Sequence, residues 1–335
     1  MRKKTAIVRL RESDTLQSVS ITSDEKPEIN ELVTEKWQRI ISLIARLVDV
    51  TAGLIMRIDD KKMKVFLKSE NPENTYPEEG SNELGNGLYC ETVIGTDREL
   101  LVANALEDKT WNQNPDVKLG MISYYGLPIK WPDEEKFGTI CVLDCKTNPY
   151  NETFKELMRE FQLSIEKDLE LLMSRETLKA LAERDMLTSL YNRRKTSEIL
   201  KSEFNRSIRY TTPLTIALID LDEFKKINDR HGHDIGDVAI LGFSEVVSSR
   251  VRSTDAFGRW GSDEFLLICP NTNSDGAIAI FEDIGGVMEV VIGETMIAVC
   301  FSYGIAEWKQ DDNNVGEFLR RADRELYKAK ALKSP

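Results

Sequence analysis

The sequence lacks the features that mark several large classes of protein. No apolar run approaches the roughly 20 residues of a membrane helix, so we expect no membrane partner. Histidine occurs only twice, at His231 and His233, and the first 230 residues therefore offer no histidine to a haem iron. Acidic residues outnumber basic ones, and the formal net charge is therefore −12. This balance argues against a nucleic-acid-binding surface, which needs basic groups along the phosphates.

Cysteine is also scarce. The five cysteines are an odd number and lie mostly in apolar stretches: Cys90, Cys141, Cys145, Cys269 and Cys300. This predicts reduced thiols in the cytoplasm rather than a disulfide framework. The basic residues at the start of the chain are not followed by a long apolar segment, so we do not expect a secretory signal.

A chain of 335 residues is too long for one ordinary hydrophobic core, and two domains are expected. Residues 1–27 are polar without a clear period, which predicts a flexible N-terminal segment. Helical spacing of apolar residues then runs from Ile29 to Leu47. Four probable strands follow, with a long polar connection at residues 71–87: residues 51–58, 64–68, 124–129 and 138–143. Residues 28–150 are thus predicted to form an α+β module with an antiparallel sheet.

Residues 151–184 contain neither proline nor glycine, which favours one long helix between the two domains. Phe161, Ile165, Leu169 and Leu172 share one face of it. Two interpretations are open. The face either caps the sheet of the first module or pairs with a second copy of the chain as a coiled coil.

Residues 185–335 alternate between strand-like and helical patterns. A short helix is expected after Asp185, followed by an apolar strand at residues 214–221 and a helical stretch interrupted at residues 231–233. Further strands are expected at residues 255–260, 265–269 and 297–305, with a final helix at residues 315–332. This gives a β-α-β-β-α-β-like order, again of the α+β class.

Carboxylates are placed where these strands end. Asp220 and Asp222 close the apolar strand, and Asp263 and Glu264 occupy the turn between two later strands. Carboxylate oxygens brought together at adjacent strand ends are the ligands that Mg²⁺ prefers. The alternative is that acidic residues simply populate turns.

Five stretches in order resemble the GGDEF family. The turn 259–265 (RWGSDEF) resembles RxGGDEF, and residues 220–229 (DLDEFKKIND) match D-x-D-x-F-K-x-x-N-D. The other three stretches are residues 185–194 (DMLTSLYNRR), 233–237 (HDIGD) and 321–330 (RADRELYKAK). The resemblance implies a domain with a core like that of nucleotidyl cyclases and polymerase palms. It also implies that the domain joins two GTP molecules into cyclic di-GMP and releases pyrophosphate.

The resemblance assigns roles to individual residues. It implies that Asp220 and Asp263 bind Mg²⁺, which Mn²⁺ can replace, with the main-chain carbonyl of Leu221. Asp263 or Glu264 would assist removal of the ribose 3′-hydroxyl proton. Lys225 and Lys330 would offset phosphate charge, for which the alternative is a solvated helix face. Gly261 and Ser262 would lie against the nucleotide.

The same resemblance places Asn228 and Asp237 at the positions that read guanine. A carboxylate accepts from the N1–H and N2 amine of guanine, whereas adenine presents a bare acceptor at N1, so Asp237 should favour GTP over ATP. The alternative is that Asn228 and Asp237 cap two helices.

Arg252 and Asp255 fit the family's RxxD site, at which cyclic di-GMP inhibits its own synthesis. An arginine can grip phosphate or guanine with two hydrogen bonds, and the aspartate can orient it. An ordinary ion pair at a helix end is the alternative.

The chain departs from the family pattern at three positions. Ser262 stands where the second glycine of the turn is expected, and a side chain there should strain the turn or crowd the nucleotide, with reduced activity. Ser189 also replaces a glycine. An arginine expected near Ser334 is missing, and Lys333 would substitute for it only in part.

Residues 28–150 resemble a GAF sensory domain in three stretches: residues 87–91 (GLYCE), 124–129 (YYGLPI) and 137–144 (FGTICVLD). GAF domains commonly hold a small ligand under loops on one face of the sheet, and the identity of that ligand is not readable. Cys90 is either a packed thiol, which is the more common case, or a reactive one.

Together these features predict a cytoplasmic diguanylate cyclase, regulated by its GAF module and by product binding. Because each domain of this family holds one GTP, catalysis requires a homodimer, and the 151–184 helix could control it. Two other functions compete with this one. The first is a catalytically weak domain that binds cyclic di-GMP through Arg252 and Asp255 as an effector, and the second is a dimerisation scaffold.

Overall fold

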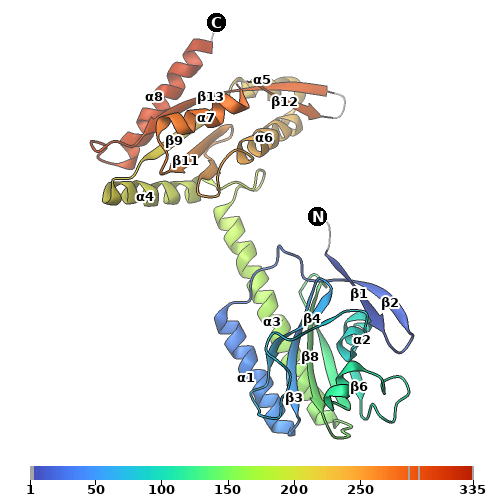
Figure 1. Cartoon of the computed structure of the whole chain (residues 1–335). Helices are drawn as coiled ribbons and strands as arrows, with labels where there is room; N and C mark the ends of the chain where they lie inside the picture. The colour runs from blue at the N-terminus through green and yellow to red at the C-terminus, as the bar shows by residue number, and fades with distance from the viewer. Residues whose placement is uncertain (1–3, 286, 293–294, 334–335) are drawn as a thin grey trace. The chain divides into compact units, whose positions relative to one another are not determined.

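The computed structural model describes residues 4–285, 287–292 and 295–333. The chain divides into two compact units, Met1–Thr177 and Leu178–Pro335, whose border falls inside the long helix α3 (Glu152–Glu183). Each unit is built on its own antiparallel sheet with helices packed against it (Figure 1). This confirms the predicted α+β class. Within the described ranges, none of the helices combines the length and apolar character needed to cross a membrane.

The first unit contains a six-stranded sheet of order β5-β4-β3-β8-β7-β6, in which all neighbours are antiparallel. Its strands are β3 (Ala52–Asp59), β4 (Lys62–Lys68), β5 (Ser81–Glu83), β6 (Leu100–Val102), β7 (Ser123–Lys130) and β8 (Lys136–Asp144). The four strands expected from sequence are β3, β4, β7 and β8. The last two are almost wholly buried because helices cover both faces of the sheet. A 3₁₀ turn, η1 (Pro115–Leu119), precedes β7.

Two helices cover one face of this sheet. Helix α1 (Glu31–Val48) begins at Asn30, whose side chain accepts the Val33 amide, and it buries Trp37 and Ile41. Helix α3 packs beside it through Phe154, Met158, Ile165, Leu169 and Leu172, all of which are buried. The capping interpretation of the long helix therefore holds for residues 154–172. Leu178 and Leu181, nearer its end, are exposed, and pairing through that part stays a prediction.

Residues 1–27 were expected to be flexible, and for the residues that the structure describes this is wrong. Strands β1 (Thr5–Leu10) and β2 (Thr15–Ser20) form a hairpin, and Ile21 bridges to Lys136. Val8 and Ile21 are fully buried, against the second face of the main sheet and helix α2 (Tyr89–Thr96). The hairpin is short and its exposed positions include the apolar Ile7 and Leu16, so the alternation of apolar and polar residues is blurred. Helix α2 was also not expected, because seven of its eight residues are buried and no amphipathic period remains.

The second unit contains a five-stranded antiparallel sheet of order β10-β11-β9-β13-β12. Its strands are β9 (Leu214–Leu221), β10 (Ala256–Arg259), β11 (Glu264–Pro270), β12 (Val287–Ile292) and β13 (Thr295–Glu307). Its helices are α4 (Arg193–Tyr210), α5 (Phe224–His231), α6 (His233–Ser248), α7 (Ser274–Ile284) and α8 (Val315–Lys333). Strand β9 lies at the centre and is buried along its whole length, as its mostly apolar sequence predicts. The order expected from sequence is present, with β12 added beside β13.

One helix of this unit begins later than expected. The short helix predicted after Asp185 is instead a turn, in which the Asp185 carboxylate accepts from the main-chain N–H and the hydroxyl of Thr188. Helix α4 begins at Arg193, after Asn192, whose side chain accepts the Lys195 amide. Asparagine is a preferred N-cap, and this cap sets the start of the helix.

Candidate active site

Acidic side chains gather at one edge of the second sheet. Asp220, at the end of β9, lies opposite Glu264 on β11 and Ser302 on β13. The Leu221 amide donates to the main-chain oxygen of Asp263 over 3.0 Å, which fixes the turn residue beside the strand. The sheet register therefore brings together the carboxylates that the sequence predicted to meet.

Burial and neighbouring negative charge raise the pKa of two of these carboxylates, Asp220 and Glu264. Burial is the main cause that raises the pKa of Asp220, and the charges of Asp263 and Asp222 add to it, while Lys330 opposes the rise. Burial likewise raises the pKa of Glu264, helped by the charges of Asp220 and Asp263. The Lys330 ammonium lies 2.5 Å from Asp220 Oδ1. The edge is thus a concentration of negative charge that Lys330 balances only in part.

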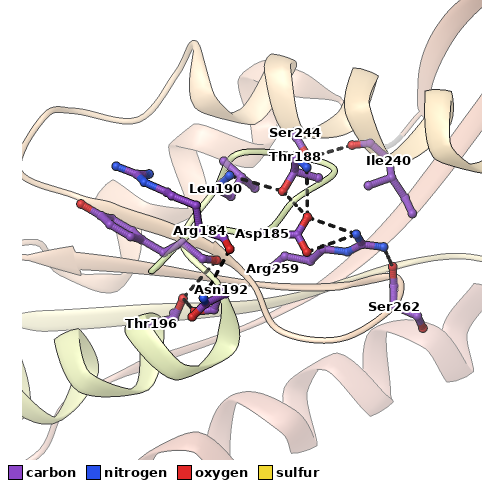
Figure 2. Close-up of polar contacts among 11 residues, drawn as sticks. Arg184, Asp185, Thr188, Leu190, Asn192, Thr196, Ile240, Ser244, Arg259 and Ser262 are labelled. Carbon is purple, nitrogen blue, oxygen red and sulfur yellow. Dashed lines mark hydrogen bonds and ion pairs between the residues drawn. The ribbon is translucent and has the colours of Figure 1, made fainter. Parts of the chain in front are cut away.

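The turn that carries Asp263 is held by main-chain hydrogen bonds and by the side chain of Arg259. The amides of Trp260 and Gly261 both donate to the main-chain oxygen of Glu264, over 2.8 and 3.1 Å. Arg259 donates to the Asp185 carboxylate over 3.1 Å and to the main-chain oxygen of Ser262 over 2.7 Å (Figure 2). A Cβ on Gly261 would lie 2.7 Å from Glu264 Oε2, so this glycine keeps the carboxylate close.

Ser262 does not strain this turn, contrary to expectation. Its φ angle lies outside the left-handed region, where a side chain costs energy. Its hydroxyl instead donates to Asp263 Oδ1 over 2.5 Å. Ser262 therefore acts on the neighbouring carboxylate rather than on the backbone.

Ser189, the other serine at a position where the family has glycine, does carry backbone strain. Its φ is +58°, in the left-handed region that glycine enters without cost. We expect Ser189→Gly to raise the free energy of unfolding of the second unit by about 1 kcal/mol. Urea unfolding followed by circular dichroism measures this change. The control Ser197→Gly, within α4, should lower it by about 0.5–1 kcal/mol, and equal effects of the two would contradict the account.

The predicted guanine readers lie where α5 meets α6. Asn228 Oδ1 is buried and has no hydrogen-bond partner, and a Cβ on Gly236 would lie 1.9 Å from it. Gly236 thus leaves room for a polar atom that nothing in the described chain satisfies. Asp237 follows on the exposed side of α6. Neither residue is a cap, because Asn228 lies inside α5 and α6 begins after Gly232.

The two predicted phosphate lysines lie on different elements. Lys225 is exposed in the first turn of α5, just after β9 ends. Lys330 reaches the acidic edge from the last turn of α8. A third lysine, Lys333, contacts Asp222 Oδ2 over 2.9 Å and the main-chain oxygen of Phe301 over 2.6 Å. Ser302 donates to the other oxygen of Asp222 over 2.7 Å.

Sequence reasoning gave no role to this Asp222 cluster. Asp222 lies inside a quoted motif, but its partners come from β13 and α8, which are far away in the sequence. Through these bonds Lys333 holds the end of α8 to the sheet, and its role as a substitute phosphate ligand stays a prediction. The position near Ser334 lies outside the described residues.

Arg252 and Asp255 form a second polar site before β10. The Arg252 amide donates to Asp255 Oδ2 over 2.9 Å, and Asp255 Oδ1 is buried without a hydrogen-bond partner. Both residues line a cavity of about 280 Å³ with Arg250 and Cys269. The contact between them is made by the Arg252 main chain, so the structure does not show the alternative, an ion pair between the two side chains. Arg252 itself is exposed.

The donor atoms at the acidic edge are of the type that binds a hard cation. Asp220, Asp263 and the carbonyl of Leu221 all offer oxygen, the donor type that Mg²⁺ and Mn²⁺ take. Among residues 4–285, 287–292 and 295–333, no group of three or more acidic, histidine or cysteine side chains lies close enough to form a complete metal cage. Two carboxylates and a carbonyl therefore fit a metal that shares its remaining positions with water and phosphate, as Mg²⁺ does.

A stability measurement tests the crowding of these carboxylates. Because the native pKa of Glu264 is raised, the folded protein binds more protons than the unfolded one, and stability falls as pH rises through the range above the ordinary pKa of 4.5. Glu264→Gln should therefore raise Tm at pH 7.5, and the gain should vanish near pH 4. Thermal unfolding at both pH values measures it, with exposed Glu282→Gln as the control. A loss of stability at pH 7.5 would contradict this electrostatic account.

Comparison with known proteins agrees with this geometry. The family model described as the diguanylate cyclase GGDEF domain matches residues 182–334, and a GAF domain model matches residues 33–163. Over 155 residues the chain is 36% identical to the probable diguanylate cyclase DgcC of Escherichia coli, covering 46% of this chain and 42% of DgcC. Over 156 residues it is 38% identical to the response regulator PleD of Caulobacter vibrioides, covering 45% of this chain and 34% of PleD.

A third relative is similar along nearly the whole chain. The diguanylate cyclase DgcP of Escherichia coli is 24% identical over 310 residues, 88% of this chain and 89% of DgcP. A crystal structure of the coiled coil and GGDEF domain of DgcB from Caulobacter crescentus, in complex with c-di-GMP, matches at 25% identity with a TM-score of 0.48, over 52% of this chain and 94% of that one. The chain spans less than half the length of DgcC and PleD. Residues 182–334 belong to the diguanylate cyclase GGDEF domain family, and residues 33–163 belong to the GAF domain family.

Proposed function

We propose that this chain is a diguanylate cyclase, which condenses two GTP molecules into cyclic di-GMP and two pyrophosphates. The observation that carries the proposal is the acidic edge formed by Asp220, Asp263 and Glu264 at the ends of β9 and β11. The sequence relatives named diguanylate cyclases support the same reaction.

Base recognition rests on the junction of α5 and α6. The unsatisfied Asn228 Oδ1 is an acceptor for an N–H of guanine, and the Asp237 carboxylate, one residue after Gly236, is a second. Adenine would leave a buried acceptor unpaired, which costs about 1–3 kcal/mol. The proposed substrate is therefore GTP rather than ATP.

Different residues of the chain are proposed to bind the metal, neutralise phosphate charge and accept the proton. Asp220, Asp263 and the Leu221 carbonyl would hold Mg²⁺ or Mn²⁺, and such an ion, when bound, neutralises phosphate charge and lowers the pKa of the attacking hydroxyl. Lys225 and Lys330 offset the remaining triphosphate charge, and Gly261 and Ser262 border the nucleotide. Glu264, whose pKa is raised toward neutrality, is suited to accept the 3′-hydroxyl proton, and Asp263 is the alternative acceptor.

The reaction needs two copies of the domain, since each is proposed to hold one GTP and the two must face each other. A homodimer built through the residue 151–184 helix would set this geometry, and an unidentified small molecule in the GAF domain would regulate it. Arg252 and Asp255, beside their cavity, are proposed to bind cyclic di-GMP and inhibit the enzyme. The setting is the cytoplasm, where free cysteines stay reduced.

One observation favours a second function. The Ser262 hydroxyl donates to Asp263 Oδ1, and this bond would compete with a metal ion for one oxygen of the carboxylate. A domain slowed in this way could serve as a cyclic di-GMP-binding effector through Arg252 and Asp255.

Substrate analogues separate these functions. Purified full-length protein with Mg²⁺ should convert GTP to cyclic di-GMP, leave ATP unchanged and form no cyclic product from 3′-deoxy-GTP, which lacks the nucleophile. Equal turnover of ATP would overturn the guanine assignment. Tight binding of cyclic di-GMP without turnover of GTP would support the effector instead.

A further inference from the structure

The GAF domain encloses two cysteines in one cavity. The cavity has a volume of about 240 Å³ and lies between the sheet, the start of α2 and the loop around Tyr76. Cys90 comes from α2 and Cys141 from the middle of β8, and both line the cavity. Cys141 is fully buried and Cys90 is 8% exposed, so the cavity is the route by which a small reagent reaches them.

Hydroxyl groups surround the Cys90 thiol. Thr139 Oγ1 donates to Cys90 Sγ over 3.3 Å, and the Tyr124 hydroxyl lies 3.5 Å from the same sulfur. Gly126 makes the second contact possible, because a Cβ there would lie 2.1 Å from the Tyr124 hydroxyl. Two hydroxyl groups, one on β7 and one on β8, thus converge on one sulfur, and Cys141 lines the same cavity.

The two thiols are unequal as a result. Hydrogen bonds from Cys141, Thr139 and Tyr124 lower the pKa of Cys90, against the opposing effects of burial and the Asp116 charge. Burial and the neighbouring Cys90 raise the pKa of Cys141 well above its ordinary value. A cysteine that ionises more readily than its neighbour is suited to attack, and the neighbour is suited to resolve the product.

We propose that Cys90 and Cys141 form a peroxide-oxidisable dithiol inside the GAF cavity. The Cys90 thiolate attacks one oxygen of hydrogen peroxide, the O–O bond breaks, and hydroxide leaves to give a sulfenic acid. Cys141 sulfur then attacks the Cys90 sulfur, its proton passes to the departing hydroxyl, and water leaves. Two thiols are oxidised to one disulfide while one hydrogen peroxide is reduced to two waters. A thiol reductant restores the pair.

The cavity shared with Cys90 singles out Cys141 among the remaining cysteines. Cys145 is exposed and Cys300 is partly exposed, so a reaction governed by access alone would begin at these two. Cys269 lies in the other unit and is buried. The proposal therefore predicts that the buried pair reacts in preference to the exposed thiol, and this separates it from oxidation governed by access.

Peptide mapping tests the proposal in the Cys145→Ser variant, because Cys141 and Cys145 share one tryptic peptide. The reduced full-length variant is treated with a small excess of hydrogen peroxide, alkylated in denaturant and digested. We expect residues 69–98 and 137–146 to be joined by a disulfide that dithiothreitol cleaves, with one peroxide consumed per link. In Cys141→Ala, dimedone should label Cys90 as a sulfenic acid, whereas in Cys90→Ser, Cys141 should stay reduced.

Two results would overturn the proposal. In the wild-type protein, Cys90 and Cys141 could remain fully alkylatable at peroxide concentrations that already oxidise Cys145. Alternatively, the two peptides could carry independent oxidation products and never be linked. Both measurements leave Cys90 and Cys141 in place, so they decide the question even where a variant of either of these cysteines fails to fold. Neither depends on turnover of GTP.

Discussion

Replacing Asp263 by asparagine is expected to reduce cyclic di-GMP formation by about 100-fold or more while the protein stays folded. Asp263 is only partly buried, and its turn is held by main-chain bonds that the substitution leaves in place. The change removes one of two carboxylates proposed to hold the metal, and losing a group that stabilises transition-state charge costs on the order of 10²–10³ in turnover. Initial rates of product formation from GTP, measured by liquid chromatography, give the effect.

The exposed Asp311 provides a matched control for this variant. It lies in the loop before α8, away from the acidic edge, and Asp311→Asn should keep the wild-type rate. Circular dichroism should show both variants folded. An Asp263→Asn protein that retains wild-type turnover would remove this carboxylate from the mechanism.

Replacing Gly236 by alanine is expected to raise the KM for GTP by about 10- to 100-fold without destabilising the domain. The new Cβ would lie 1.9 Å from Asn228 Oδ1, so the flexible end of Asn228 must swing away and its contact with guanine is lost. Losing one hydrogen bond to a buried polar group costs about 1–3 kcal/mol, which converts to this change in KM. Alanine otherwise favours a helix interior by about 1 kcal/mol over glycine, so the fold should tolerate it.

Two further variants isolate the role of Asn228. Asn228→Ala should raise KM by a similar factor, and the double variant should be little worse than either single one, because both remove the same contact. Gly316→Ala, near the exposed start of α8, should leave KM unchanged. A wild-type KM for Gly236→Ala would show that guanine is not read at this junction.

Much of the second unit could be predicted because its local patterns agree with its tertiary structure. The mostly apolar segment at residues 214–221 forms the buried central strand β9, and Gly232 separates α5 from α6 where a break was expected. The motifs then located the carboxylates correctly at neighbouring strand ends. Sequence could not predict the bond of Lys333 to Asp222, since it depends on where α8 packs. It could not predict the bond of Ser262 to Asp263 either, since that depends on the conformation of the turn.

The first unit was harder to predict for a physical reason. The hairpin of β1 and β2 exposes the apolar Ile7 and Leu16, and α2 is buried on nearly all sides, so neither shows the hydrophobic period that reveals an element. The pairing of the two cysteines could not be predicted from the sequence either. Cys90 and Cys141 are 51 positions apart, and only the packing of α2 over β8 brings them into one cavity.

The most direct test of the proposed activity is a product balance. Full-length protein, stripped of bound nucleotide, is incubated at high concentration with GTP and Mg²⁺, and cyclic di-GMP and pyrophosphate are both quantified. The account predicts cyclic di-GMP and two pyrophosphates for each molecule of it. GTP that remains intact, or that is hydrolysed without any cyclic di-GMP, would contradict it.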